Sequence, residues 1–176
     1  YARHDGEAPA VCQAILQHYR PQSMEGSIPE SAEGQVLSLA DRLDSLASFF
    51  HVGMVPTGSE DPFALRRHAT AVVRILLEGG VRLNLGRAIS EARTIVGAAG
   101  IKAGSTQGDG QQRLVDCAFE RVRHYARTVH GLRDDVVNAV VSVTDRQSFD
   151  LRDLLAKMQA LHAVTSRAEF DPLIVG

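Results

Sequence analysis

The chain has 176 residues, of which 44% are hydrophobic and 23% charged, and its formal net charge is -2. These values are typical of a globular chain with one domain or two small ones, and they argue against disorder and against a strongly basic nucleic-acid-binding domain. No apolar stretch reaches the roughly 18 to 20 residues that span a bilayer, so we expect a soluble chain. Aromatic residues make up only 5% and Trp is absent, which favours packed helices over a β-sandwich.

Three amphipathic helices are predicted in the first half of the chain. Pro9 suits the first turn of a helix that Pro21 ends. After a loop, a second helix covers Val36–Phe50, and a third begins at Asp61-Pro62 and ends at Gly79-Gly80. Their apolar positions recur at steps of three and four and are Val11, Ile15, Leu16 and Tyr19, then Val36, Leu39, Leu43, Leu46, Ala47 and Phe50, then Leu65, Ala69, Val72 and Leu76.

The second and third of these helices should pack against each other, because each carries one apolar stripe that needs a partner. We expect Leu43 to contact Val72. The four side chains expected to be buried between the two helices are Leu43, Leu46, Leu65 and Val72.

Four more helices are predicted in the second half, at Leu85–Val96, Leu114–Val129, Val136–Val141 and Leu151–Leu161. The valines of the third are β-branched, but their spacing of i, i+1, i+4 and i+5 is helical. An apolar tail, 173–175, ends the chain. The sequence therefore predicts an all-α fold built as a helical bundle.

A glycine-rich segment separates the two halves, with glycines at positions 97, 100, 104, 108 and 110. Such a segment is typical of a flexible connection. It lacks the Gly-Lys-Ser/Thr order of a phosphate-binding loop. We therefore expect a domain at 1–97, a linker at 98–110 and a second domain at 111–176.

Two features bear on whether the chain is part of a longer protein and on its cellular compartment. It begins with Tyr1 and no signal sequence follows, so we expect a piece of a longer protein. Cys12 and Cys117 lie in helical patterns about a hundred residues apart, where small buried thiols are the expectation. Reduced cysteines fit a cytoplasmic protein.

Several strings are more specific than periodicity. They are Tyr1–Glu7 (YARHDGE), Ala40–Leu46 (ADRLDSL), Pro56–Gly58 (PTG) and Asp61–Arg67 (DPFALRR). In this order and spacing they closely resemble the C-terminal half of the beta subunit of the bacterial tetrameric glycyl-tRNA synthetase. The later strings Phe119–Tyr125 and Asp135–Val140 resemble the start of its anticodon-binding domain, which is like that of arginyl-tRNA synthetase. The resemblance covers nearly the whole chain and is densest up to Glu78.

This resemblance implies a degenerate HD-like helical domain followed by part of an anticodon-binding helical bundle. In that family the alpha subunit carries the class II active site, and the beta subunit supplies much of the tRNA binding. The implied partners are the alpha subunit and tRNA(Gly), in a hetero-tetramer that uses ATP and Mg to ligate glycine. The chain itself is expected to be non-catalytic and to hold no cofactor or metal. The chain departs from the family's pattern after Met158, where the family's closing stretch is missing, and Asp171–Gly176 resembles a cut before the final helices. The bundle is therefore expected to be incomplete.

Two acidic motifs invite a metal-site interpretation. His4-Asp5 could belong to an HD-type metal hydrolase with Asp41 or Asp44 as the distant ligand, although the pair precedes a helix start and lacks upstream histidines. Asp41 and Asp44 lie three residues apart on one helix face, where ion pairing is commoner than metal binding. We favour a structural role for them, paired across the helix interface with Arg66, Arg67 or Arg74.

A charged stripe is predicted on the helix that follows the glycines. Its residues at steps of three and four are Arg113, Asp116, Glu120, Arg123 and Arg127. One interpretation is a solvated face of ion pairs. The other, implied by the resemblance, is contact with the anticodon loop through phosphates and base stacking. The candidate RNA-binding residues are Arg121, Arg123, Tyr125, Arg127, Arg133 and Arg146.

The leading hypothesis is a tRNA-recognition and scaffolding part of the glycyl-tRNA synthetase beta subunit. One alternative is a fragment of an HD-type metal-dependent phosphohydrolase. Another is a helical protein-interaction module that has no RNA role. Metal analysis distinguishes the first alternative, and tRNA binding distinguishes the second.

Overall fold

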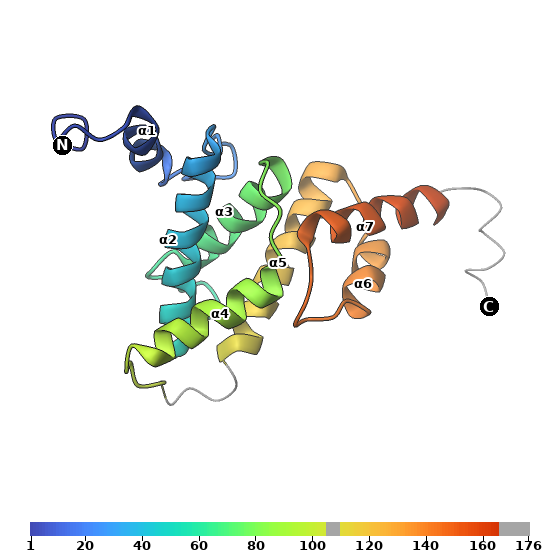
Figure 1. Ribbon diagram of the computed structural model, residues 1–176. Coiled ribbons are helices and arrows are strands. Elements are labelled where there is room, and N and C mark those ends of the chain that lie inside the picture. Colours follow the sequence, from blue (N-terminus) through green and yellow to red (C-terminus); the bar gives the residue numbers. More distant parts are fainter. Residues whose placement is uncertain (105–109, 166–176) are drawn as a thin grey trace.

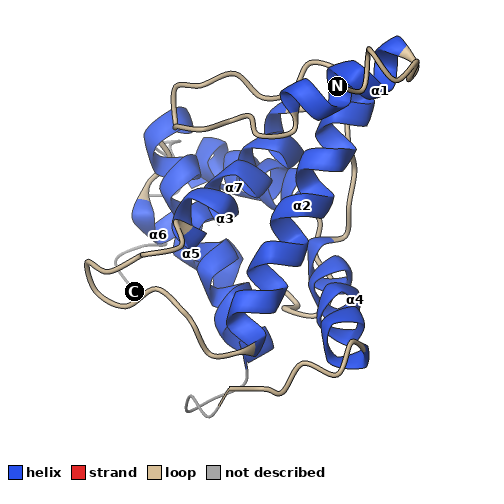
Figure 2. Ribbon diagram, turned by 90° about the vertical axis from the view of Figure 1, so that its left-hand side faces the viewer, coloured by secondary structure: helices blue, strands red, loops and turns tan. Residues whose placement is uncertain are grey.

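A computed structural model describes residues 1–104 and 110–165, and within these ranges the chain is helical (Figures 1 and 2). The helices are α1 (Pro9–Gln17), α2 (Ala32–His51), α3 (Leu65–Glu78), α4 (Leu85–Ala98), α5 (Gly110–His130), α6 (Asp134–Ser142) and α7 (Leu151–Thr165). The extended pairing in these ranges amounts to two isolated bridges, Thr57 with Glu60 and Asn84 with Asp150. The predicted all-α class is confirmed. None of the helices in these ranges has the length and apolarity that crossing a membrane requires.

Local signals set most helix starts. The Ser31 side chain accepts a hydrogen bond from the Gly34 amide at α2, and Asn84 does the same for Arg87 at α4. At α3 the expectation was partly wrong, because the helix begins at Leu65, four residues after Asp61. Asp61 still satisfies the first amides, since its carboxylate accepts from Leu65 N at 2.8 Å and Arg66 N at 3.0 Å.

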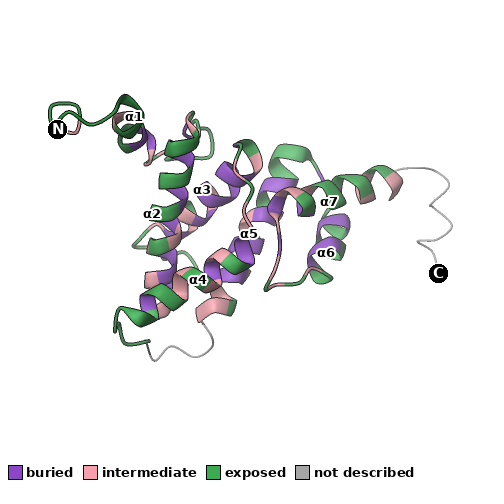
Figure 3. Ribbon diagram, viewed as in Figure 1, coloured by how far each residue is buried: buried purple, intermediate pink, exposed green. Residues whose placement is uncertain are grey.

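The core joins helices from both halves of the chain (Figure 3). α2 packs on α3 as predicted, and both contact α5. Leu46, Leu65 and Val72 are at most 3% exposed, whereas Leu43 is only partly buried at the edge of the cluster. Phe119 in α5 belongs to the same cluster. The division into 1–97, 98–110 and 111–176, with its HD-like and anticodon-binding assignments, stays a prediction.

The ends of the glycine-rich segment pack against the C-terminal end of α2. Gly104 N donates to His51 O at 3.0 Å, and the His51 ring nitrogen Nε2 lies 2.9 Å from Ile101 O. A Cβ on Gly104 would overlap the Val52 carbonyl oxygen, and one on Gly110 would lie 2.6 Å from Phe50 O. These two glycines therefore allow close packing, where a flexible connection was expected. Residues 105–109 of the predicted linker, and the tail 166–176, lie outside the described residues.

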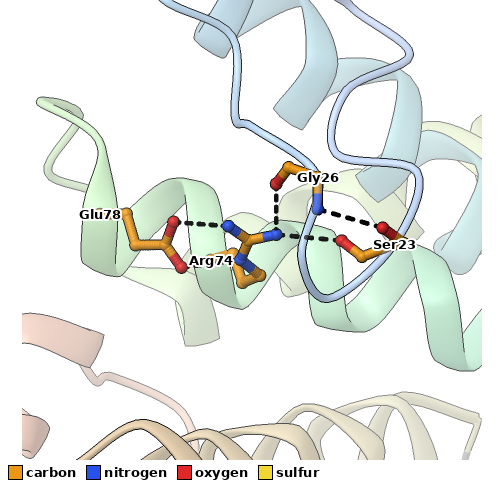
Figure 4. A network of polar contacts seen from close by, with 4 residues as sticks. All are labelled: Ser23, Gly26, Arg74 and Glu78. Carbon is orange, nitrogen blue, oxygen red and sulfur yellow. Dashed lines mark hydrogen bonds and ion pairs between the residues drawn. The ribbon is translucent and has the colours of Figure 1, made fainter.

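Two buried arginines hold the loop between α1 and α2 by hydrogen bonds to its backbone. Arg74, 7% exposed, donates to the carbonyl oxygens of Ser23 at 3.0 Å and Gly26 at 2.6 Å, and it pairs with Glu78 (Figure 4). Arg42, 5% exposed, donates to the carbonyl oxygens of Tyr19 and Pro21 at 2.8 and 3.2 Å.

Buried amides continue this polar attachment on the α2 side of the loop. The Gln17 side chain accepts from Glu30 N, and the Gln35 side chain donates to Pro29 O and accepts from Gly80 N. Side chains that bond backbone groups thus fix the loop against α2 and α3, in addition to the packing of α1 on α2.

α1 turns most of its apolar side chains away from the body of the protein. The predicted helix is confirmed, but its buried residues are Ala14 and Gln17. The apolar positions of its stripe are all exposed, at 42% for Val11, 45% for Ile15, 68% for Leu16 and 63% for Tyr19. Cys12 on the same helix is half-buried, and Cys117 is buried as predicted; both are free thiols.

Candidate nucleic-acid interface

The turn from α5 to α6 gathers two arginines and two aspartates. Arg127 Nη1 lies 2.7 Å from Asp134 Oδ1, and Arg133 makes two contacts with Asp135, at 3.1 and 2.5 Å. The hydrogen bonds from Arg133 hold the pKa of the Asp135 carboxyl below its usual range. Both arginine side chains are nearly half exposed, so their guanidinium groups remain accessible from solvent.

Two more arginines pair with acids of α5, Arg121 on that helix and Arg146 in the turn after α6. Arg146 contacts Asp116 and lies over the Phe119 ring, 5.3 Å from its centroid. Arg121 lies 3.6 Å from Glu120. At 100° per residue, Arg121 is also turned away from the stripe that holds Arg123 and Arg127. At this spacing Arg123, Arg127 and the Asp116 that Arg146 contacts share one face of α5, whereas Arg121 lies on another.

The remaining two RNA-binding candidates behave differently. Arg123 is half-buried, makes no ion pair among the residues that the structure describes, and has a buried Nε without a hydrogen-bond partner. Tyr125 is 6% exposed and packs near His130. Burial, together with the Glu78 carboxylate, raises the pKa of the Tyr125 hydroxyl. Tyr125 thus has no ring face free to stack on a base, contrary to the role expected for it.

The expected interhelical ion pairs do not form within residues 1–104 and 110–165. Asp41 and Asp44 are exposed on α2. Arg66 instead donates to the carbonyl oxygens of Gly58 at 2.8 Å and Glu60 at 3.4 Å, and Arg67 is exposed. The reason is that the buried residues of α2 include Leu39, Arg42 and Leu46, and the two acids lie outside this buried set.

Within the described residues, His4 and Asp5 form no group of metal-ligating side chains with Asp41 or Asp44. The pair lies in an exposed turn, with side chains 93% and 67% exposed and 3.4 Å apart. In the described ranges no three His, Cys, Asp or Glu side chains are grouped as a metal site needs. Water activation by a metal ion in an HD-type site requires several such ligands together.

A polar cavity of about 360 Å³ lies between the loop before α3 and the first half of α5. It joins Pro56 and Arg66 from the strings near α3 to Arg113, Cys117 and Glu120 of α5. Burial raises the pKa of the Cys117 thiol to about 11, so that group is not poised as a nucleophile. Arg66 and Arg113 lie in this lining together with the carboxylates of Asp116 and Glu120, a charge-balanced set that can position a polar ligand.

Sequence reasoning missed the buried arginines. Arg42 and Arg74 bind mainly backbone carbonyls of a distant loop. Every residue has a backbone carbonyl, so the sequence does not indicate which ones accept these hydrogen bonds. Burial lowers the pKa of Arg42, and the same cause, with the nearby Arg42 charge, lowers that of His68. The one available signal concerns Arg42, which lies three residues after Leu39 and four before Leu46 in the apolar stripe of its helix. Arg74 lies two residues from both Val72 and Leu76, off its stripe, and gave no such signal.

Comparisons with known proteins agree on one family. The sequence model described as "Glycyl-tRNA synthetase beta subunit" matches residues 1–142. A "Glycine--tRNA ligase beta subunit" of Acidithiobacillus ferrooxidans is 44% identical over 93% of this chain and 23% of the relative. Those of Acidobacterium capsulatum and a Geobacter species are 42% and 40% identical over 97% and 99% of this chain.

The chain spans about a quarter of the length of these curated relatives, between 23% and 24%. That it corresponds to their C-terminal half stays a prediction. The sequence identity and the coverage of this chain are high enough to assign it to a family. The chain belongs to the glycyl-tRNA synthetase beta subunit family.

Proposed function

We propose that this chain is a tRNA-recognition and scaffolding part of a glycine–tRNA ligase beta subunit. It would support the ligation of glycine to tRNA(Gly) in a cytoplasmic hetero-tetramer with the alpha subunit. We place ATP and Mg²⁺ on that assembly and not on this chain. The observation that carries the proposal is the group of arginines on α5, just before α6 and in the turn after it, of which Arg127, Arg133 and Arg146 are the most exposed. We call Arg121, Arg123, Arg127, Arg133 and Arg146 the arginine surface, in which Arg121 lies on a different side of α5 from Arg123 and Arg127.

The ion pairs of the arginine surface are compatible with RNA binding. Pairs between half-exposed side chains contribute only about 0 to 1 kcal/mol to stability. A phosphate group can therefore replace the Asp134 carboxylate on Arg127 at little cost, because a guanidinium binds both in the same bidentate geometry.

Charge counting predicts the strength of this binding. The arginine surface has five guanidinium groups, and four carboxylates pair with them: Asp116, Glu120, Asp134 and Asp135. The local charge is therefore only +1, so binding by this surface alone should be weak. Appreciable affinity would need further contacts from the rest of the assembly, through effective concentration.

The test uses the complete alpha-beta assembly with Arg123→Gln and Arg127→Gln introduced together. If these arginines meet phosphates, tRNA(Gly) affinity should fall and the slope of log K against log salt should decrease by roughly 1 to 2. Glycine-dependent pyrophosphate exchange should stay unchanged, because amino-acid activation does not use this surface. Affinity is measured at two salt concentrations.

Arg20→Gln is the matched control, because Arg20 also makes an exposed ion pair, with Glu30, beside α1 at the opposite end of the molecule (Figure 1). It should change neither quantity. Unchanged tRNA affinity in the double variant, at both salts, would remove the arginine surface from the site and favour a protein-interaction role. Loss of pyrophosphate exchange would indicate misassembly of the subunits.

A further inference from the structure

The outer face of α1 is an apolar surface that this chain does not cover. We define it by Val11, Ile15, Leu16 and Tyr19, which are 42 to 68% exposed. Val11 and Ile15 lie one helical turn apart with Leu16 beside them. Tyr19 follows in the turn after α1, which ends at Gln17. The side chains that attach the helix, Ala14 and Gln17, lie on the opposite side.

Apolar exposure is concentrated in this part of the molecule. Of the 14 exposed large hydrophobic residues in the described ranges, eight fall within residues 1–37. A cavity of about 450 Å³ adjoins the outer face of α1 and is lined by Tyr1, Arg3, Cys12, Ile15 and Leu16. The hollow is lined by apolar side chains together with Arg3, Glu7 and Gln13. An apolar ridge beside such a hollow is a shape that a helix face can pack against.

The attachment of α1 does not use these side chains. The loop that follows α1 is fixed by the hydrogen bonds of Arg42, Arg74 and Gln35 to its backbone. The exposed parts of these side chains therefore add little to the stability of this chain. Contiguous apolar surface without an internal role marks an interaction site.

We propose that the outer face of α1 docks onto an apolar helix face in the remainder of the same beta-subunit polypeptide. The inference rests on family membership, since relatives are about four times longer than this chain, which covers 23 to 24% of them. It is independent of the proposed tRNA role.

The size of the surface favours an occupant on the same polypeptide. Four partly exposed side chains offer roughly 400 Å² of apolar area, about half of the 800 Å² per partner that a standard interface buries. A separate chain, including a second copy of this one, would gain too little from it alone. A segment of the same polypeptide is held at high effective concentration, so the same small area suffices.

The position of the surface supports the same occupant. Tyr1 and Arg3 line the cavity beside Ile15 and Leu16. Polypeptide joined to Tyr1 in a longer subunit would emerge directly next to the outer face of α1.

The experiment compares this 176-residue chain with a full-length beta subunit that contains it. Hydrogen exchange of the α1 amides should be at least about tenfold slower in the full-length subunit. Leu16→Glu should lower the melting temperature of the full-length subunit by several degrees and abolish the added protection. In the 176-residue chain the same substitution should leave the melting temperature unchanged, because Leu16 is exposed there.

Ile95→Glu in α4 is the matched control, because Ile95 and Leu16 are both 68% exposed. It should leave α1 protection intact in the full-length subunit. Equal α1 exchange in the two proteins would overturn the proposal. It would also be overturned if protection arose only after the alpha subunit was added, or if the 176-residue chain dimerised in light scattering and Leu16→Glu abolished that dimer.

Discussion

Leu16 in α1 is 68% exposed, whereas Leu65 at the start of α3 is 1% exposed, although both belong to regularly spaced apolar stripes. α3 buries its stripe against α2 and α5. The loop after α1 is held instead by hydrogen bonds from Arg42 and Arg74. Two regions of one molecule thus use different forces, apolar burial in one and side-chain bonds to backbone in the other.

Periodicity therefore predicts a helix, but it does not identify the element or partner that covers the apolar face of that helix. An apolar face that packs within the chain contributes about 25 cal/mol per Å² of buried area. A face that remains exposed contributes nothing until a partner arrives. Matched substitutions in the two regions should therefore have unequal effects.

The largest difference is expected for Leu65→Ala against Leu16→Ala. Leu65→Ala should cost about 3 to 5 kcal/mol of unfolding free energy, because it leaves a cavity between α2, α3 and α5 that can only partly close. Leu16→Ala should change stability by less than about 0.5 kcal/mol. Denaturant unfolding of this chain measures both. Equal losses would contradict the outward orientation of α1.

A smaller loss is expected for Arg74→Met, which tests the polar attachment. The substitution keeps most of the side-chain length but leaves the Ser23 and Gly26 carbonyl oxygens without their donor, at a cost of about 2 to 3 kcal/mol. Hydrogen exchange should rise in the loop 18–31 more than in α5. Arg20→Met, at an exposed ion pair, is the control and should stay within about 0.5 kcal/mol. A uniform rise across the chain would mean that the loop has no separate attachment.

Most of the fold could be predicted because its signals are local. The stripes of α2, α3 and α5 locate those helices and the buried Leu46, Leu65 and Val72. Asp61 was expected as a cap and caps α3, but Ala64 adopts a left-handed φ of 53° before the helix begins. A non-glycine residue in that conformation is not foreseeable from propensity, since it depends on the bonds that hold the turn.

The candidate interface was predictable only in part. Spacing places Arg123 and Arg127 on one face of α5, but only three-dimensional packing decides that Tyr125 points inward and that Arg127 meets Asp134. The expected pairing of Asp41 and Asp44 failed for the same reason, because the choice of helix face that meets α3 depends on packing. Contacts between distant segments carry no sequence signal in a single chain.

The glycine-rich segment offers a third contrast, between two alanine substitutions. Gly104→Ala should cost about 1 to 3 kcal/mol, because its Cβ would overlap the Val52 carbonyl oxygen and the backbone must shift. Gly97→Ala, inside α4 and with open space at its Cβ, should stabilise the chain by about 0.5 to 1 kcal/mol. Thermal unfolding measures the stability change of both variants. Stabilisation by Gly104→Ala would instead support the flexible linker that the sequence predicts.

The smallest effect concerns the two thiols, one in each region. Burial raises the pKa of Cys117 in α5 to about 11, whereas Cys12 in α1 is half-buried at the surface. At pH 8 roughly one Cys117 in a thousand is therefore a thiolate, the form that reacts with iodoacetamide. Mass spectrometry should find Cys12 alkylated first, and the rate at Cys117 should rise about tenfold per pH unit below pH 11.

Proton linkage fixes the direction of the accompanying stability change. The folded chain holds the Cys117 proton more tightly than the unfolded chain, in which the thiol pKa is near its ordinary value of 9.0. The stabilisation is therefore complete below pH 9 and is lost as the pH rises toward 11. The variant Cys12→Ser allows the alkylation rate of Cys117 to be measured alone. In guanidinium chloride, where the native sequence is unfolded, its two thiols should react at similar rates. Preferential alkylation of Cys117 at pH 8 in the folded chain would contradict the burial of the α5 core face and, with it, the contrast between the two regions.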